Sequence, residues 1–305
     1  MSGVEQVFAA ASPAPINRPW RPSGYPRLHG SELTWAIAFL VPYAAVFLAF
    51  AAYPIVYALW MGSKPSLYAA LLDDPLYPTT VVNTVLFVGL GVNLMMFLAL
   101  LLSGFFMRRR WWIKALLVVY VVPWALAEVQ SFTSIHWILI SEMGLVNRLL
   151  EELFGIEGPM WFGNRWLALG CNIASYIWKW MPFWTLIFMA GRMSIPQDLN
   201  DAAAIDGATG PRRFVHLTFP MLANLYLVCT LLATLWTIGD FNTAYFVSSG
   251  APVKSTEVLA TLGFRYTLEG IKPDLGVAAM MSAIPLVIPI VIMLLRRLQT
   301  REVQL

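Results

Sequence analysis

Long apolar runs separated by short polar segments dominate the chain. Three runs carry no Asp, Glu, Lys or Arg: residues 33–63 (31 residues), 75–107 (33 residues) and 275–295 (21 residues). Three more are interrupted or bounded by a single charge: residues 114–141, 166–191 and 222–247. A helix needs about 20 apolar residues to cross the hydrocarbon core of a bilayer. Because helices are the only form suited to lipid-exposed runs of this length, the pattern predicts six transmembrane helices.

Composition supports the same fold class. Of the 305 residues, 59% are apolar and 12% are charged, whereas a soluble domain is roughly half apolar and a quarter charged. We therefore expect an all-α integral membrane protein. The proline-rich residues 1–32 are predicted to form a loose tail, followed by a first transmembrane helix over residues 33–63. That helix starts too late and is too long for a cleaved signal peptide.

The basic residues predict the orientation. The N-terminal tail, the second and fourth loops and the C-terminal segment 296–305 together carry 13 Lys and Arg residues, and the opposite side carries 6. Since cytoplasmic loops are enriched in Lys and Arg, both termini are expected to be cytoplasmic. The net charge of +3 reflects this topology and does not indicate a nucleic-acid partner.

One external loop has structure of its own. Between the third and fourth spans, one face of a short helix is predicted to be apolar and the other to carry Arg148 and the glutamates 151 and 152. The apolar residues are Leu145, Leu149, Leu150, Leu153 and Phe154. Such a helix could lie along the outer leaflet of the membrane or serve as a platform for an external partner. The sequence leaves both interpretations open.

Residues 194–220 form a polar insert of about 27 residues between two spans, which is long for a plain connection. A first short helix is predicted to end at Gly207, and Ala202 and Ala203 give it a small-residue face. A second short helix is expected to turn Phe214 and Leu217 inward, and Pro220 is expected to break the chain before the fifth span. This organisation favours a docking element.

The same residues resemble the motif E-A-A-x-x-x-G-x9-I-x-L-P found in permease subunits of ABC importers. Here Asp201, Ala202 and Ala203 are followed by Gly207 and then, after nine residues, by Leu217-Thr218-Phe219-Pro220. The departures (Asp for Glu, Leu for Ile and Phe for Leu) are conservative. The stretches "WKWMPFWTLIFMAGRMSIP" and "FNTAYFVSSGAP" also resemble the carbohydrate-importing branch of that family. The similarity extends from about residue 79 to the C-terminus.

The resemblance implies a type I ABC importer permease fold, with a permease domain over residues 79–295 and coupling helices over 194–220. In such a system the coupling helices dock into a groove of an ABC ATPase. The implied partners are two copies of that ATPase, a second homologous permease subunit forming a heterodimer, and an external solute-binding protein. The chain lacks G-x-x-x-x-G-K-[ST], so ATP and Mg are expected to be used by the ATPase and no cofactor is expected here.

Ionisable groups inside the spans are candidates for lining the solute path. Glu128, Lys179 and Asp240 interrupt apolar runs, and such groups are expected to face protein or a water-filled cavity. They could pair with one another or line the solute path, and both interpretations stay open. Sugar recognition requires aromatic faces together with amides and carboxylates. The candidate substrate-binding residues are Glu128, Lys179, Trp180, Phe183, Asp240, Phe241, Asn242 and Tyr245; in some family members a Phe-Asn pair at the place of residues 241–242 contacts sugar.

We therefore expect a permease that carries a carbohydrate or polyol across the inner membrane by alternating access. A first alternative keeps the architecture and imports glycerol phosphate or a glycerophosphodiester. A second is an ion-coupled secondary transporter, which would leave the coupling helices without a purpose. No cluster of nucleophile and base or of metal ligands is apparent, so neither an enzyme nor a metal site is predicted.

Overall fold

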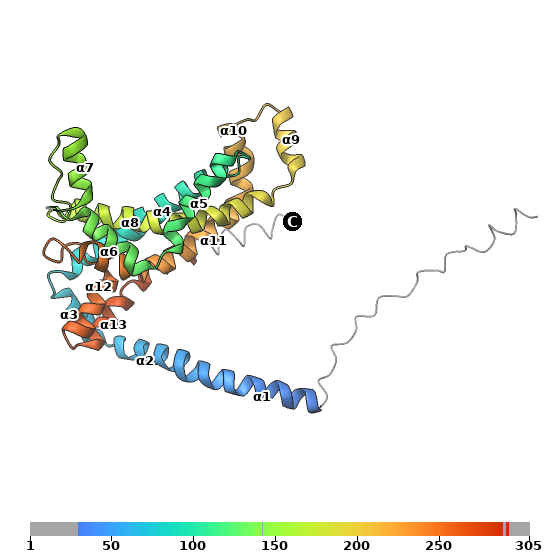
Figure 1. The fold of residues 1–305 in the computed structure, drawn as a ribbon. Coiled ribbons are helices and arrows are strands. Elements are labelled where there is room, and N and C mark those ends of the chain that lie inside the picture. The colour runs from blue at the N-terminus through green and yellow to red at the C-terminus, as the bar shows by residue number, and fades with distance from the viewer. Residues whose placement is uncertain (1–29, 142, 289–290, 293–305) are drawn as a thin grey trace, which may run out of the picture. The chain divides into compact units, whose positions relative to one another are not determined.

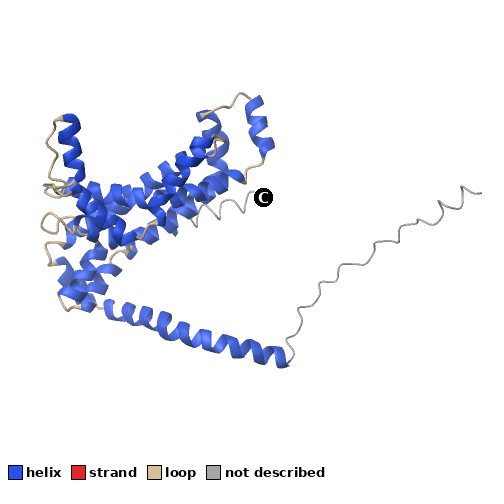
Figure 2. Ribbon diagram, viewed as in Figure 1, coloured by secondary structure: helices blue, strands red, loops and turns tan. Residues whose placement is uncertain are grey.

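The computed structural model describes residues 30–141, 143–288 and 291–292, which form helices and connecting loops without a strand (Figure 2). The chain divides into two compact units, residues 1–55 and residues 56–305. The tail predicted for residues 296–305 lies outside the described residues, as does nearly all of the tail predicted for residues 1–32.

The first unit contains helix α1 (Gly30–Phe47) and the π-helical turn η1 (Leu48–Ala52), and it ends within α2 (Tyr53–Gly62). Large apolar side chains lie exposed along it, including Phe39 (74% exposed) and Phe50 (79%). Water would be a poor solvent for this surface and lipid a good one. The most apolar 18-residue stretch of the helical run from Thr34 to Gly62 has a mean hydropathy of 2.1. The length and composition of this run are those expected of the predicted first span.

Three long helices form the core of the second unit. Helices α4 (Tyr77–Phe106), α8 (Arg165–Met193) and α11 (Phe219–Ile238) lie side by side (Figure 1). Their facing sides bury one apolar cluster that includes Phe87, Met95, Met96, Tyr176, Trp184, Phe188, Leu222 and Ala233. This packing fixes α8 and α11, the two helices on either side of the predicted coupling segment.

The remaining elements surround that core. They are α3 (Pro65–Leu72), α5 (Trp111–Ala125), α6 (Glu128–Leu139), α7 (Leu145–Phe154), α9 (Gln197–Ile205), α10 (Pro211–Arg213), η2 (Phe214–Thr218), η3 (Ala244–Ser248), α12 (Leu259–Phe264), η4 (Arg265–Glu269) and α13 (Pro273–Met281). A second, smaller core joins α3, α12 and α13 through Leu71, Leu259, Leu262 and Leu275. Helix α7 has the bounds that the apolar spacing indicates.

Among the described residues, three helices are long and apolar enough to cross a membrane: 34–62, 77–106 and 211–238. Helices α5 and α6 together are also long and apolar enough, with a bend of 100° at residues 126–127, and they count as a fourth span when taken as one crossing. Helix α8 has the length, at 29 residues, but polar side chains such as Asn172 and Lys179 lower its mean hydropathy. The predicted run 275–295 extends beyond the described residues. Six spans therefore stay a prediction.

Pro220 does not break the chain, contrary to the prediction. Residues 211–238 form one continuous helical run, with Pro220 in the first turn of α11. The π-helical turn η2 precedes it, and the backbone N–H of Phe219 donates to the carbonyl of Phe214. A π turn has an i→i+5 hydrogen bond in place of the i→i+4 bond of an α turn, and the helical run continues through the proline. The turn η1 precedes Pro54 in the same way.

Candidate functional site

A cavity of about 330 Å³ lies where α6, α8 and the end of α11 meet. Three described elements contribute to its lining, which consists of Glu128, Tyr176, Trp180, Trp236, Gly239, Asp240, Phe241 and Asn242. Five of these were candidates from the sequence, at positions far apart in the chain. The fold therefore brings together Glu128, Trp180, Asp240, Phe241 and Asn242, and it adds Tyr176, Trp236 and Gly239, which sequence reasoning missed.

Glu128 is held at the cavity by the break between α5 and α6. It is in the first turn of α6, where the positive end of the helix dipole favours a carboxylate. Its Oε2 atom accepts a hydrogen bond from Asn242 Nδ2 at 3.1 Å. This bond joins α6 to the segment that follows α11, across 114 positions of sequence.

Asp240 contributes the second carboxylate of the cavity. Its Oδ1 atom accepts a hydrogen bond from the backbone N–H of Thr243 at 3.2 Å, which fixes the turn after α11. Its Oδ2 atom is buried and has no hydrogen-bond partner among the described residues. Since buried polar atoms are normally paired, this oxygen is an unsatisfied acceptor in the wall of the cavity.

Aromatic rings line the cavity or support its wall. Trp180 and Trp236 both line it, with ring centroids 6.4 Å apart. Phe183 and Tyr245 do not line it. Phe183 stacks on Trp124 at 5.6 Å, and Tyr245 stacks on Phe241 at 4.6 Å. The ring centroid of Phe183 also lies 6.0 Å from that of the lining residue Trp236, so these two candidates support the wall of the cavity.

Lys179 is buried and turns away from the cavity. Its Nζ atom donates to the backbone carbonyls of Pro123 (2.7 Å) and Leu126 (2.6 Å) and lies 3.5 Å from Ser131 Oγ. These carbonyls belong to the end of α5 and the break that follows, where helical N–H partners are missing. The lysine thus stabilises the break, and it forms no ion pair with Glu128 or Asp240.

The predicted docking segment folds into helix α9, a glycine turn and helix α10. Gly207 has φ = +73°, a conformation that glycine adopts at no steric cost. Asp201 is exposed and accepts a hydrogen bond from Gln197 Nε2, whereas Ala202 is exposed and Ala203 is half-buried. Phe214 and Leu217 are half-buried, in agreement with their predicted inward orientation.

Arg192 connects this segment to the core, a role that sequence reasoning missed. Its Nε atom donates to Ser103 Oγ (2.7 Å) and its Nη2 atom donates to the Leu100 carbonyl (3.0 Å), both on α4. Its guanidinium group lies 5.6 Å from the ring centroid of Phe214. A single side chain at the end of α8 therefore contacts both α4 and η2.

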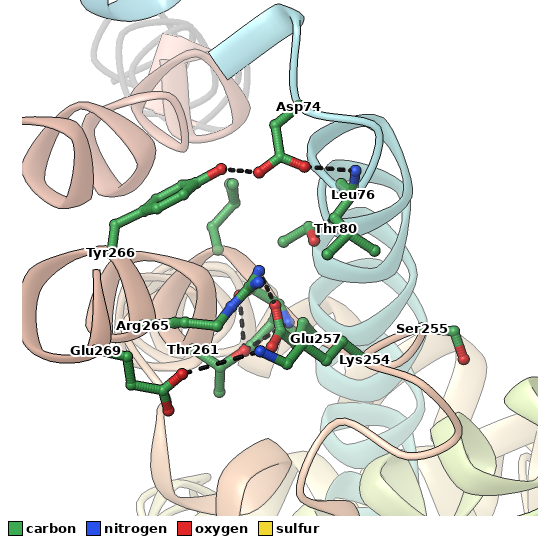
Figure 3. A network of polar contacts seen from close by, with 12 residues as sticks. Asp74, Leu76, Thr80, Lys254, Ser255, Glu257, Thr261, Arg265, Tyr266 and Glu269 are labelled. Atoms are coloured by element: carbon green, nitrogen blue, oxygen red, sulfur yellow. Dashed lines mark hydrogen bonds and ion pairs between the residues drawn. The ribbon is translucent and has the colours of Figure 1, made fainter. Parts of the chain in front are cut away.

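A polar network stabilises the opposite end of the second unit (Figure 3). Arg265 donates to Glu257 Oε2 at 2.6 Å, and the hydroxyl of Tyr266 donates to Asp74. Burial raises the pKa of the Glu257 carboxyl, against the opposing charges of Arg265 and Lys254. Asn83 on α4 donates to the carbonyls of residues 255 and 257. The network fixes residues 248–258 against α4.

Among the described residues, no group of three or more His, Cys, Asp or Glu is arranged to hold a metal ion.

Comparison with protein families gives a match over residues 78–304 to the model described as "Binding-protein-dependent transport system inner membrane component". Among characterised relatives, the chain is 31% identical over 220 residues to the sulfoquinovosyl glycerol transport system permease protein SmoG of Agrobacterium fabrum, covering 71% of this chain and 70% of that protein. It is 28% identical to the trehalose/maltose transport system permease protein MalF of Thermococcus litoralis, covering 82% and 88%.

Two further proteins extend the comparison. The sn-glycerol-3-phosphate transport system permease protein UgpA of Brucella abortus is 33% identical, over 63% of this chain and 65% of that protein. Among solved structures, a bacterial ABC transporter involved in the import of the acidic polysaccharide alginate has a chain that superposes with a TM-score of 0.72. It covers 88% of this chain and 96% of its own length at 21% identity, so this similarity concerns the fold alone.

Proposed function

The chain belongs to the family of binding-protein-dependent transport system inner membrane components, and we propose that it carries an uncharged carbohydrate or polyol through the inner membrane. As a member of that family it is the multi-pass permease of an ABC importer, a non-catalytic transport component. The proposal adds six spans, cytoplasmic termini and alternating access.

The cavity is the observation that carries the proposal. Trp180, Trp236 and Phe241 offer aromatic surfaces, while Glu128, Asp240 and Asn242 offer hydrogen-bond acceptors and one amide donor. Ligand sites typically combine apolar walls with a few convergent polar groups. A sugar ring has apolar C–H faces and polar hydroxyl edges, so it complements both parts of this lining.

The charge of the lining favours an uncharged solute. Its described residues include two carboxylates and no Lys, Arg or His. Lys179, which would have supported a phosphate cargo, donates to backbone carbonyls outside the cavity. The alternative of glycerol phosphate is suggested by the similarity to UgpA, but an anion would meet two carboxylates without a compensating cation. The alternative of an ion-coupled transporter is not favoured by the family.

We propose that the ATPase drives the conformational change of the permease through α9 and the turn at Gly207. The exposed face of α9, with Asp201, Ala202 and the 87% exposed Ile205, is proposed to dock on one of two ABC ATPase subunits. A second, homologous permease and an external solute-binding protein complete the proposed assembly. Gly207→Val should weaken ATPase binding in a pull-down of the purified complex while membrane insertion persists, and unchanged binding would contradict the docking role.

Uptake into proteoliposomes tests the solute and its path. The vesicles contain this chain, its sister permease and the ATPase, with the binding protein outside, and the solute is the one that raises the melting temperature of the binding protein. Uptake should require ATP, and Asn242→Ala should alter its rate or preference because that amide lies in the cavity wall. Asn93→Ala is the matched control, since Asn93 donates only to its own helix on an exposed face. An anionic solute, or equal effects of both variants, would refute the proposal.

A further inference from the structure

Helix α7 is an amphipathic helix with a sharply defined end. Gly155 has φ = +64°, and the N–H groups of Gly155 and Ile156 donate to the carbonyls of Glu151 and Leu150, a glycine-terminated helix end. At 100° per residue, Leu145, Leu149 and Leu153 share one side of the helix. Arg148, Glu151 and Glu152 occupy much of the remaining circumference.

The apolar side of α7 is open. Leu145 is 54% exposed, Leu149 42% and Leu153 69%. Ile156 and Met160, just after the helix, are 57% and 69% exposed. Contiguous apolar surface of this kind, with a polar side opposite, marks a contact with a partner or a membrane.

The orientation of α7 is fixed from its other side. Asn147 donates to the carbonyls of Ser141 (3.0 Å) and Pro159 (3.3 Å), and it accepts from Trp161 Nε1 at 2.7 Å. A Cβ atom at Gly158 would lie 2.1 Å from Asn147 Oδ1, so the returning chain packs closely here. Since Asn147 is about 160° around the helix from Leu145 and Leu149, the returning segment covers the polar side and leaves the leucines uncovered.

The direction of α7 indicates what covers these leucines. Figure 1 shows α7 extending across the direction of α8, beside the N-terminal end of that helix. If α8 crosses the membrane, α7 runs along its surface. Exposed tryptophans stand on both sides of the segment, Trp137 (61%) near the end of α6 and Trp166 (62%) at the start of α8. Such rings are typical of the membrane–water interface.

We propose that α7 lies in the outer leaflet, with its leucine side among the lipid headgroups and upper acyl chains and with Arg148, Glu151 and Glu152 in water. An amphipathic helix binds a membrane in this manner through buried apolar area. The exposed leucine side would then continue the lipid-facing surface of the spans. This inference rests on the proposed span through α8 and is independent of the identity of the solute.

Spin-label accessibility tests the proposal on the complete permease–ATPase complex in phosphatidylethanolamine/phosphatidylglycerol liposomes without binding protein. A background with Cys171→Ser and Cys229→Ala removes both cysteines of the sequence. Labels are then introduced at Leu149→Cys and, as the matched control on the opposite face, at Glu151→Cys, which is about 160° around the helix. The collision rate with oxygen, which concentrates in lipid, is compared with that of a water-soluble nickel chelate.

We expect a several-fold higher ratio of oxygen to nickel collisions at position 149 than at position 151. Equal ratios, with both labels open to nickel, would place α7 in water and overturn the proposal. Protection of position 149 from both reagents would show that protein covers the leucines, and it would overturn the proposal in favour of a partner platform. The two collision ratios do not depend on solute uptake. A failure of the proposed transport function can therefore be distinguished from a failure of the proposed position of α7.

Discussion

Replacing Lys179 with Met should destabilise the break between α5 and α6. The variant removes the only side-chain donor that the described contacts give to the carbonyls of Pro123 and Leu126. Met has a similar length and is apolar, so the change removes the charge and its hydrogen bonds with little change in packing.

Two opposing contributions determine how much the free energy of unfolding changes in this variant. Hydrogen bonds to a charged group contribute about 1.5–3 kcal/mol each, so two of them amount to about 3–6 kcal/mol. The lysine also loses hydration at depth, and insertion scales give this penalty as about 2.5–3.5 kcal/mol. The midpoints of the two ranges differ by about 1.5 kcal/mol, so we expect a net loss of about 1.5 kcal/mol in the free energy of unfolding.

Denaturant unfolding of the purified complex measures this loss, and hydrogen exchange over residues 124–131 locates it. Exchange should become faster there, since the first turn of α6 loses its support. Met95→Leu is the control, because Met95 is fully buried in the neighbouring core and the swap is close to volume-conserving. If Lys179→Met matched Met95→Leu in both measurements, the proposed role of the lysine would be refuted.

Three further predictions concern the helices that link the two ends of the protein. Arg192→Met should reduce solute uptake per ATP hydrolysed, because the contact of the guanidinium group with Ser103 is lost; unchanged stoichiometry would contradict this. Gly276→Ala should reduce the free energy of unfolding by about 1–3 kcal/mol, because its Cβ would lie 2.5 Å from the Gly263 carbonyl oxygen. A calorimetric scan should show a lower melting temperature, and an unchanged one would contradict this. Val228→Pro, at an exposed position in α11, should abolish uptake while ATP hydrolysis persists, whereas Val228→Ala should retain uptake.

The sequence predicted local structure well where a residue type favours one particular backbone conformation or helix position. Gly207 was expected to end a helix, and its φ of +73° agrees. The spacing of Leu145, Leu149 and Leu153 gave the bounds of α7. The meeting of Glu128 with residues 240–242 was anticipated only as a shared polar site, since the sequence cannot specify that a 100° bend brings α6 to the end of α11.

Other features depended on contacts between distant segments. Pro42, Pro123 and Pro182 all lie inside helices, yet only the helix with Pro123 ends within three residues. The difference is that Lys179, 53 positions after Leu126, supplies donors to the carbonyls that the break exposes. Proline alone therefore could not locate the break. Lys179 was likewise indistinguishable from a cavity residue, because an intramembrane lysine must find acceptors in either case.

The error at Pro220 changes how the two sites are connected. A broken chain would have left the docking segment attached through a flexible hinge. The continuous run of 28 residues from 211 to 238 instead gives a rod of about 42 Å at 1.5 Å per residue. One end of that rod follows the turn at Gly207, and the other ends immediately before Gly239 and Asp240 of the cavity. If the proposed docking segment moves, its displacement would therefore reach the cavity carboxylate through a single helix, with α8 and Arg192 alongside.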